Sequence, residues 1–223
     1  MLLRIPSILD RGQLKMVREI LASSTFVDGK LSAGMTAQRV KRNEELAQDA
    51  RELDALNKIV MGNLVRHPVY INGALPHRVA SPYYVRYTLG MLYGDHVDDP
   101  VMGPGPRYRS DIAITIFLSD PSTYDGGELL IRTSFGDCEA KLPAGDGILY
   151  PASSLHHVSE ITRGERVVAV TWVQSLVRDP AKRELLYELS VAREKLLKDS
   201  PDSEETTRVN TAYVNLMRMW AEV

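Results

Sequence analysis

The sequence contains a single cysteine, Cys138, so no disulfide can form within the chain. A chain of this kind is typical of a reducing compartment, and we expect it in the cytoplasm. No apolar run approaches the ~18 residues that a membrane helix requires. The first residues lack the basic start and apolar stretch of a signal peptide. The sequence therefore predicts no membrane partner.

A strong net charge is also missing. The 27 basic and 29 acidic residues leave a formal charge of −2, so we expect no nucleic-acid partner, because such binding relies on a positive field. Hydrophobic residues make up 44% of the sequence and charged residues 25%, which is the balance of a globular protein and not of a disordered one. Aromatic residues are only 7%, which predicts a largely aliphatic core.

Helical periodicity occurs at both ends of the chain. Apolar residues recur at helical spacing after Asp10, a candidate N-cap, and again over residues 44–64. Residues 65–82 are rich in proline, and we expect them to be irregular with one short strand at 69–71. Beyond residue 179, two amphipathic stretches separated by a polar break predict a helical hairpin. This hairpin would pack on the core or on a second copy of the chain.

The middle of the chain has the character of a β domain. Short runs rich in β-branched and aliphatic residues, such as 112–118 and 167–173, are separated by turn sequences such as Asp-Gly-Gly at 125–127. They predict an all-β sandwich or barrel, and the lack of βαβ alternation excludes a Rossmann fold. We therefore expect an N-terminal helical and irregular segment, a β core and a C-terminal helical hairpin, over residues 1–82, 83–178 and 179–223.

His96-Val97-Asp98 is the strongest chemical signal. Spacing i, i+2 on an extended strand places an imidazole and a carboxylate on one face, whereas Asp99 would point away. Two histidines and one carboxylate form the facial triad of non-haem Fe(II) oxygenases. Candidates for the third ligand are the remaining histidines: His67, His77, His156 and His157. His156 and His157 follow a predicted strand and a short turn, where a barrel presents groups to its mouth.

Arg166 lies ten residues after His156 and begins the predicted strand 167–173. If the strands carrying His156 and Arg166 are antiparallel neighbours, Arg166 points into the same cavity, and Trp172 shares its face. A guanidinium has the fork geometry that binds a carboxylate. A dicarboxylate such as 2-oxoglutarate could then bind the metal at one end and Arg166 at the other.

Several motifs in combination resemble the 2-oxoglutarate- and Fe(II)-dependent prolyl-4-hydroxylase-like dioxygenases, and most closely the bacterial PKHD-type hydroxylases. The resemblance rests on HVD at 96–98, DGGEL at 125–129, PAGDGILYP at 143–151 and H-x-x-x-E-I-x-x-G-x-R at 156–166. The flanking segments AGMTAQRVKRNEEL and NLMRMWAEV are similar to that subfamily as well. The resemblance thus covers nearly the whole chain.

The resemblance implies an α+β fold, with a double-stranded β-helix (jelly-roll) core and helices packed outside. It implies Fe(II) bound by His96, Asp98 and His156, and a distal carboxylate of 2-oxoglutarate bound by Arg166. It selects His156 over His157, because the family places the arginine ten residues after this ligand. Tyr87 resembles a tyrosine that contacts the co-substrate. The implied reaction hydroxylates a substrate while 2-oxoglutarate is decarboxylated to succinate and CO2, with L-ascorbate as a candidate additional cofactor.

The sequence does not identify the substrate, which is either a small molecule or a peptidyl side chain. Basic and polar residues that precede the core are candidates to line the entrance and to meet a polar or anionic substrate: Arg39, Lys41, Arg42 and Asn43. Tyr93 is a candidate for the mouth of the cavity, and Cys138 reads as a buried small residue. Two other functions stay open. One is a non-catalytic metal-binding or iron-sensing jelly-roll, and the other is a Zn(II) enzyme with the same ligands.

Overall fold

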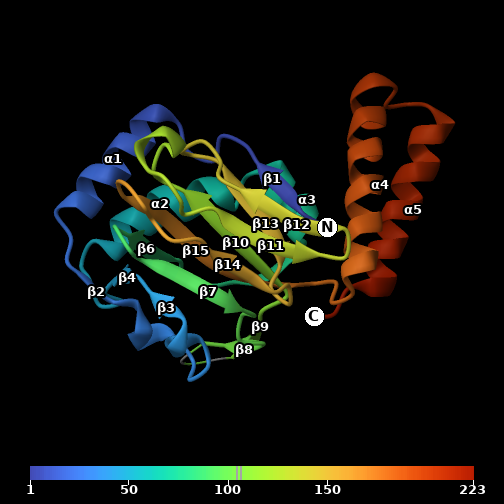
Figure 1. Cartoon of the computed structure of the whole chain (residues 1–223). Coiled ribbons are helices and arrows are strands. Elements are labelled where there is room, and N and C mark those ends of the chain that lie inside the picture. The colour runs from blue at the N-terminus through green and yellow to red at the C-terminus, as the bar shows by residue number, and fades with distance from the viewer. Residues whose placement is uncertain (104, 106) are drawn as a thin grey trace.

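Two antiparallel β-sheets face each other in the computed structural model, which describes residues 1–103, 105 and 107–223 (Figure 1). The larger sheet has the order β1 (Leu3–Ile5), β13 (Gly147–Pro151), β10 (Ile112–Phe117), β15 (Arg166–Ser175), β6 (Tyr83–Tyr87), β4 (Glu44–Leu46) and β2 (Phe26–Asp28), and β5 (Pro76–Val79) pairs with the end of β15. The smaller sheet has the order β12 (Gly136–Ala140), β11 (Leu129–Thr133), β14 (His156–Val158), β7 (Leu92–His96) and β3 (Lys41–Arg42). This layout agrees with the expected α+β jelly-roll.

Helices cover the outer face of the larger sheet. α1 (Arg11–Ala22) and α2 (Leu53–Leu64) bury one stripe each, including Val17 and Val60, against sheet residues such as Ile114. The Asp10 side chain caps α1 by accepting a hydrogen bond from the Gln13 N–H, as predicted. Because β10 lies between this helical layer and the smaller sheet, all six of its residues are buried. This explains why its sequence is apolar on both faces, Thr115 excepted, rather than alternating.

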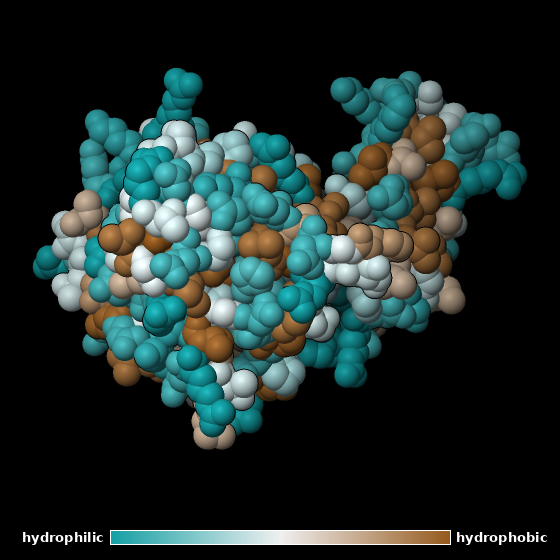
Figure 2. Space-filling model, in the orientation of Figure 1, coloured by the Kyte–Doolittle hydropathy of each residue, from teal (hydrophilic) through white to brown (hydrophobic). Residues whose placement is uncertain are grey.

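The C-terminal residues form the predicted hairpin. α4 (Pro180–Asp199) begins at Pro180, with Asp179 as its N-cap, and α5 (Glu204–Trp220) returns beside it. In Figure 1 the hairpin stands to one side of the sandwich. Apolar side chains gather where its two helices meet, and hydrophilic residues cover its tip (Figure 2). Leu186 on α4 is fully buried against Leu75 and Val177, so the base of the hairpin is anchored in the core.

Two sequence predictions about the N-terminal part are wrong. Residues 44–64 do not form one helix, because Glu44–Leu46 is a strand that pairs with β6 and only Leu53–Leu64 is helical. Tertiary pairing overrides the local helical pattern there. The strand expected at 69–71 is part of the helix α3 (Pro68–Ala74). Pro68 occupies the first turn, where no backbone N–H is needed, and the His67 ring accepts the Val69 N–H.

Shorter elements complete the structure. A two-stranded hairpin of β8 (Val101–Met102) and β9 (Tyr108–Arg109) follows the smaller sheet, and short 3-10 turns lie at Gly29–Ser32, Ala37–Arg39 and Pro121–Thr123. Among the helices of the described residues, none has both the length and the apolar character needed to cross a membrane. The space between the two sheets holds a second apolar cluster that includes Val85, Phe117 and Val168. The residues singled out as chemical candidates lie along this space.

Candidate metal centre

His96, Asp98 and His156 converge at one end of the space between the sheets. Each offers a ligand atom, and the three atoms lie within 4.8 Å of one another. The two histidines are direct partners across the antiparallel pair β7 and β14, which places their rings 4.2 Å apart. All three side chains are less than a tenth exposed. Two imidazoles and one carboxylate in this arrangement can bind a divalent metal ion.

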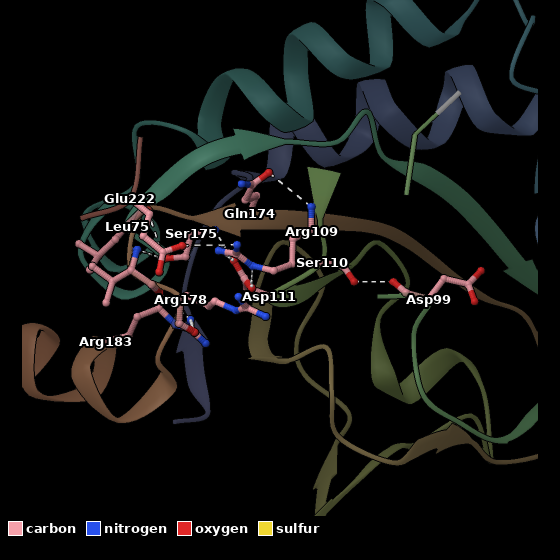
Figure 3. Close-up of polar contacts among 11 residues, drawn as sticks. Leu75, Asp99, Arg109, Ser110, Asp111, Gln174, Ser175, Arg178, Arg183 and Glu222 are labelled. Carbon is pink, nitrogen blue, oxygen red and sulfur yellow. Dashed lines mark hydrogen bonds and ion pairs between the residues drawn. The ribbon is translucent and has the colours of Figure 1, made fainter. Parts of the chain in front are cut away.

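Asp98 reaches the centre from a loop and not from a strand. The i, i+2 prediction assumed that His96 and Asp98 lie on the same strand. β7 ends at His96, so this is true of His96 and not of Asp98. The following loop is held by Ser110, whose N–H donates to the Pro100 carbonyl at 3.1 Å and whose hydroxyl donates to the Asp99 carbonyl at 2.5 Å. Figure 3 shows the second contact. Ser110 thus fixes the backbone immediately after the candidate ligand.

The residues on either side of Ser110 are tied to the C-terminal segment (Figure 3). Arg109 pairs with Asp111 through two hydrogen bonds of 2.6 and 3.1 Å, and its guanidinium lies 3.6 Å from the Glu222 carboxylate. Asp111 also accepts the Ser175 N–H at 2.9 Å. The loop that carries Asp98 is therefore linked by short polar contacts to the base of the helical hairpin.

Both histidines have one ring nitrogen committed to the backbone. His96 Nδ1 lies 2.8 Å from the Gly94 carbonyl, and His156 Nδ1 lies 2.9 Å from the Ser154 carbonyl. A carbonyl only accepts, so each Nδ1 carries the proton and each Nε2 is left with a free lone pair. Burial, together with the neighbouring His156, lowers the pKa of His96 to about 3. His96 is therefore neutral at pH 7, which is the form that binds a metal.

The candidate carboxylate is buried without full pairing. Burial raises the pKa of Asp98, although His156 and the indole of Trp172 act in the opposite direction. Asp98 Oδ2 and Trp172 Nε1 have no hydrogen-bond partner among the described residues. A buried carboxylate oxygen without a partner is costly, and a bound cation would remove that cost. The donor set and this orphaned atom both fit a divalent metal ion.

Arg166 faces the same space, but from the opposite sheet. It begins β15 in the larger sheet, whereas His156 lies on β14 in the smaller one, so these two strands are not antiparallel neighbours, which was the condition considered from the sequence. Both strands present side chains to the space between the sheets, so the predicted convergence is preserved. Trp172, at even spacing, shares the inner face with Arg166 as predicted.

The Arg166 guanidinium is buried without an anionic partner among the described residues. Its side chain is 1% exposed, and the N–H groups at its Nε and Nη1 atoms donate to no protein acceptor there. Its Cζ lies 5.0 Å from the centre of the Tyr87 ring and 5.6 Å from that of Phe117. The hydroxyl of the adjacent Tyr124 is also buried and unpartnered. An arginine in such surroundings requires an anion, and a ligand carboxylate would supply one.

Gly127 makes room for that guanidinium. A Cβ at this position would lie 2.9 Å from Arg166 Cδ and 2.5 Å from Ile161 Cδ1. The backbone there has φ of +67°, which glycine adopts without strain. The Asp-Gly-Gly sequence, read as a turn, is therefore also part of the wall around Arg166.

The other candidate residues lie outside this space or at its margin. His67 caps α3 and contacts the Pro6 carbonyl, and His77 is exposed on β5. His157 points to the opposite face of β14 from His156 and lies 2.8 Å from the Asp95 carboxylate. Cys138 lies on a strand as expected, but it is only half-buried because β12 is an edge strand.

The residues expected to line the entrance divide into two groups. Arg39 and Arg42 are exposed, whereas Lys41 and Asn43 are buried between the sheets. Lys41 Nζ lies 2.5 Å from Glu45 Oε1, so its charge is compensated within the protein. Tyr93 stacks on His96 with ring centres 3.6 Å apart, which places it at the metal centre.

Two residues of the site escaped the sequence analysis. Tyr124 follows the turn Pro121–Thr123, and Tyr150 lies on β13 with its ring centre 5.2 Å from that of His156. Both are tyrosines in a chain with few aromatic residues. The available signal was that Tyr124 directly precedes DGGEL and that Tyr150 lies within GILYP. Only the pairing of the sheets shows which face each side chain occupies.

Comparison with family models and curated proteins gives consistent results. Residues 82–174 match the 2OG-Fe(II) oxygenase superfamily, and residues 180–222 match the PKHD-type hydroxylase C-terminal domain. A PKHD-type hydroxylase from Thioalkalivibrio sulfidiphilus is 51% identical over 224 residues, and one from Caulobacter vibrioides is 43% identical over 229 residues. Both alignments cover 100% of this chain and 100% of the relative.

Solved structures share the fold at low sequence identity. A prolyl hydroxylase from Trichoplax adhaerens, in complex with a hypoxia inducible factor peptide fragment, has a TM-score of 0.57 at 16% identity, covering 82% of this chain and 86% of that chain. HygX from Streptomyces hygroscopicus, with nickel, 2-oxoglutarate and hygromycin B bound, has a TM-score of 0.53 at 15% identity, covering 79% and 84%. These likenesses confirm the jelly-roll fold.

Proposed function

The chain belongs to the PKHD-type hydroxylases of the 2OG-Fe(II) oxygenase superfamily, and we propose specific roles for its residues in that reaction. The protein is an Fe(II)- and 2-oxoglutarate-dependent hydroxylase. In our proposal His96, Asp98 and His156 bind the iron, Arg166 binds the distal carboxylate of 2-oxoglutarate, and Tyr87 contacts the same co-substrate. The observation that carries this assignment is the buried, unpaired guanidinium of Arg166 across the cavity from the three ligand atoms.

The proposed ligands suit the reaction because they occupy few coordination positions. Three protein ligands leave other positions open to small molecules. When bound, the iron supplies the oxidative chemistry that decarboxylates 2-oxoglutarate and hydroxylates a C–H bond of the substrate. The backbone carbonyls of Gly94 and Ser154 hold the two imidazoles with Nε2 toward the centre.

Arg166 and its neighbours orient the co-substrate in this proposal. The guanidinium forms a fork that matches a carboxylate, and its burial excludes water that would compete for it. Tyr87 is the cross-strand partner of Arg166, and its ring lies against the guanidinium. Tyr93, stacked on His96, restricts that imidazole to one orientation.

A metal sensor without turnover is the second candidate function. It would need the three metal ligands but would have no use for an uncompensated arginine buried in the same cavity. The Arg166 environment therefore favours the enzyme. The family acts on peptides or small molecules, and the substrate of this chain belongs in that range. We further propose a catalytic core over 83–178 with the hairpin as a site of self-association, and a cytoplasmic location in keeping with the single cysteine.

An anaerobic titration tests the proposal. Fe(II) and then 2-oxoglutarate are added to metal-free protein, and the visible spectrum is recorded for the weak charge-transfer band of a chelated keto acid. We expect a band in the wild type, and Arg166→Leu should need far more 2-oxoglutarate to develop it while binding Fe(II) normally. If the wild type binds Fe(II) but develops no band, the sensor or another metalloenzyme replaces this function.

A further inference from the structure

Asn43 is a buried amide with no hydrogen-bond partner among the described residues. It lies where the chain passes from β3 in the smaller sheet to β4 in the larger one, and so closes one edge of the sandwich. Its side chain is 4% exposed, and both Nδ2 and Oδ1 are unpartnered. Burying an amide in this way costs free energy unless a ligand satisfies it. Asn43 has no role among the metal ligands or the co-substrate contacts of the proposed function.

The strand register places Asn43 beside Tyr87 and Arg166. β4 pairs with β6 through Glu44↔Arg86 and Glu45↔Val85, so the next step of this antiparallel register sets Asn43 opposite Tyr87. Tyr87 is in turn the partner of Arg166 on β15. Directly opposed residues present their side chains on the same face of a sheet. The three side chains therefore form one row across the inner face of the larger sheet.

This row offers donors to an anion. The Arg166 guanidinium, the Tyr87 hydroxyl and the Asn43 amide all carry polar hydrogens. The nearest acidic side chain in the next row, Glu45, is paired with Lys41 at 2.5 Å. The local field is therefore left positive by Arg166.

Because Gly29 has no side chain, the Asn43 side chain can occupy the space beside it. A Cβ built at Gly29 would lie 1.9 Å from Asn43 Oδ1, a distance that no packed pair of atoms tolerates. The Gly29 N–H also donates to the Asn43 carbonyl at 3.0 Å. The glycine thus fixes the backbone of Asn43 and admits its amide to the inner face.

We propose that Asn43 is a co-substrate-binding residue, whose Nδ2–H donates to the distal carboxylate of 2-oxoglutarate alongside Arg166 and Tyr87. This inference rests on the proposed function and adds to it a residue outside the matched oxygenase segment 82–174. The ligand is a dicarboxylate, because the row of donors binds a carboxylate at the end of the molecule that does not contact the metal. Asn43 is not among the three candidate metal ligands, so it acts on binding of the co-substrate and not on binding of the metal.

The test compares two keto acids on Mn(II)-loaded protein by calorimetry. 2-Oxopentanoate has the length of 2-oxoglutarate but lacks its distal carboxylate. We expect Asn43→Leu to raise the Kd of 2-oxoglutarate about 10- to 100-fold, as for a lost hydrogen bond to a charged group. The Kd of 2-oxopentanoate and that of Mn(II) should not change. Asn43→Asp should be worse than Asn43→Leu for 2-oxoglutarate, because it adds a negative charge beside the carboxylate.

Gly29→Ala supplies a second route to the same readout. It leaves the amide in the chain but displaces it, so it should also weaken 2-oxoglutarate binding, and its effect should not add to that of Asn43→Leu. Asn215→Leu, at an exposed position on α5, is the matched control and should bind as the wild type does.

Two results would overturn the inference. One is a Kd of 2-oxoglutarate within about twofold of wild type in both Asn43→Leu and Gly29→Ala. The other is an equal loss for 2-oxoglutarate and 2-oxopentanoate, which would make Asn43 a structural residue only. Arg166→Leu, measured alongside, separates a failure of the Asn43 inference from a failure of the proposed function. If Arg166→Leu loses 2-oxoglutarate binding, the proposed function is upheld even when Asn43 has no effect. Lack of 2-oxoglutarate binding by the wild type would instead remove the function itself.

Discussion

His156 and His157 are adjacent in the sequence but face opposite sides of β14. The His156 ring lies 4.2 Å from that of His96 inside the sandwich, whereas His157 lies 2.8 Å from Asp95 on the outer face. This follows from the alternation of side chains along a strand. His157 can therefore serve as the matched control for a substitution of His156 in the metal centre.

We expect His156→Ala to lose stoichiometric Fe(II) binding, because it removes one of only three candidate protein ligands. His157→Ala should retain it, since its partner is Asp95. Metal content after anaerobic loading and desalting measures both. Retained iron in His156→Ala together with lost iron in His157→Ala would show that the ligand assignment is reversed.

Ser110→Ala should weaken metal binding about tenfold, because outer partners of ligands contribute on that scale. The hydroxyl that holds the Asp99 carbonyl, next to Asp98, is lost, while the Ser110 backbone contact remains. Competition with a chelator of known affinity gives the metal Kd. Ser23→Ala, which removes a hydroxyl bonded to the Ile20 carbonyl at the end of α1, should leave that Kd unchanged.

Gly127→Ala and Gly136→Ala should separate backbone strain from steric exclusion. Both positions have positive φ, so backbone strain should cost each variant on the order of 1–2 kcal/mol of unfolding free energy, and the steric overlaps at Gly127 add to that cost. Only Gly127→Ala places a methyl group 2.9 Å from Arg166 Cδ, and at Gly136 nothing lies within 4 Å. A raised Kd for 2-oxoglutarate is therefore expected in the first variant alone. Equal Kd values in both variants would contradict the wall described around Arg166.

Leu186→Ala should destabilise the protein by about 2–5 kcal/mol, since it opens a cavity at the anchored base of the hairpin. Its neighbour Leu185 is 61% exposed, and Leu185→Ala should change the free energy of unfolding by no more than about 0.5 kcal/mol. Urea unfolding followed by circular dichroism measures both. Similar values for the two variants would mean that the hairpin is not docked in this way.

Glu128 should contribute to stability only above acidic pH. Burial alone would raise the pKa of its carboxyl, but hydrogen bonds from Ser159 and Lys141 lower it below its usual value. A lowered pKa in the folded state adds stability above the unfolded value of ~4.3 and loses it as pH falls through the folded value. Glu128→Gln should therefore reduce the Tm at pH 7 and flatten its decline toward pH 3. The exposed Glu139, changed to glutamine, should do neither.

The metal centre was accessible from the sequence because its signals are short-range. His96 and Asp98 are two residues apart, and the family resemblance selected His156 by its spacing to Arg166. Arg166 was correctly placed in the same cavity but for the wrong reason, since spacing alone does not tell whether two strands are neighbours or face each other across a sandwich. That distinction depends on the closing of the two sheets, which involves strands far apart in the chain.

The N-terminal part was the least predictable for the same reason. Residues 44–46 carry a helical pattern, but pairing with β2 and with β6, about forty residues later in the chain, makes them a strand. The environment of Asn43 follows from that pairing and from the passage between sheets. A local pattern could mark it as a polar residue near the entrance, but not as a buried amide opposite Tyr87.

The pairing of β1 with β13 has a consequence for the order of events on the ribosome. Leu3 is made long before its partner, Leu149, which follows most of the strands of the sandwich along the chain. Because synthesis runs at roughly 5–20 residues per second, the first strand waits for seconds with its apolar side chains uncovered. The larger sheet can close only after β13 and β15 have been made, so the nascent chain has unpaired strand edges until then.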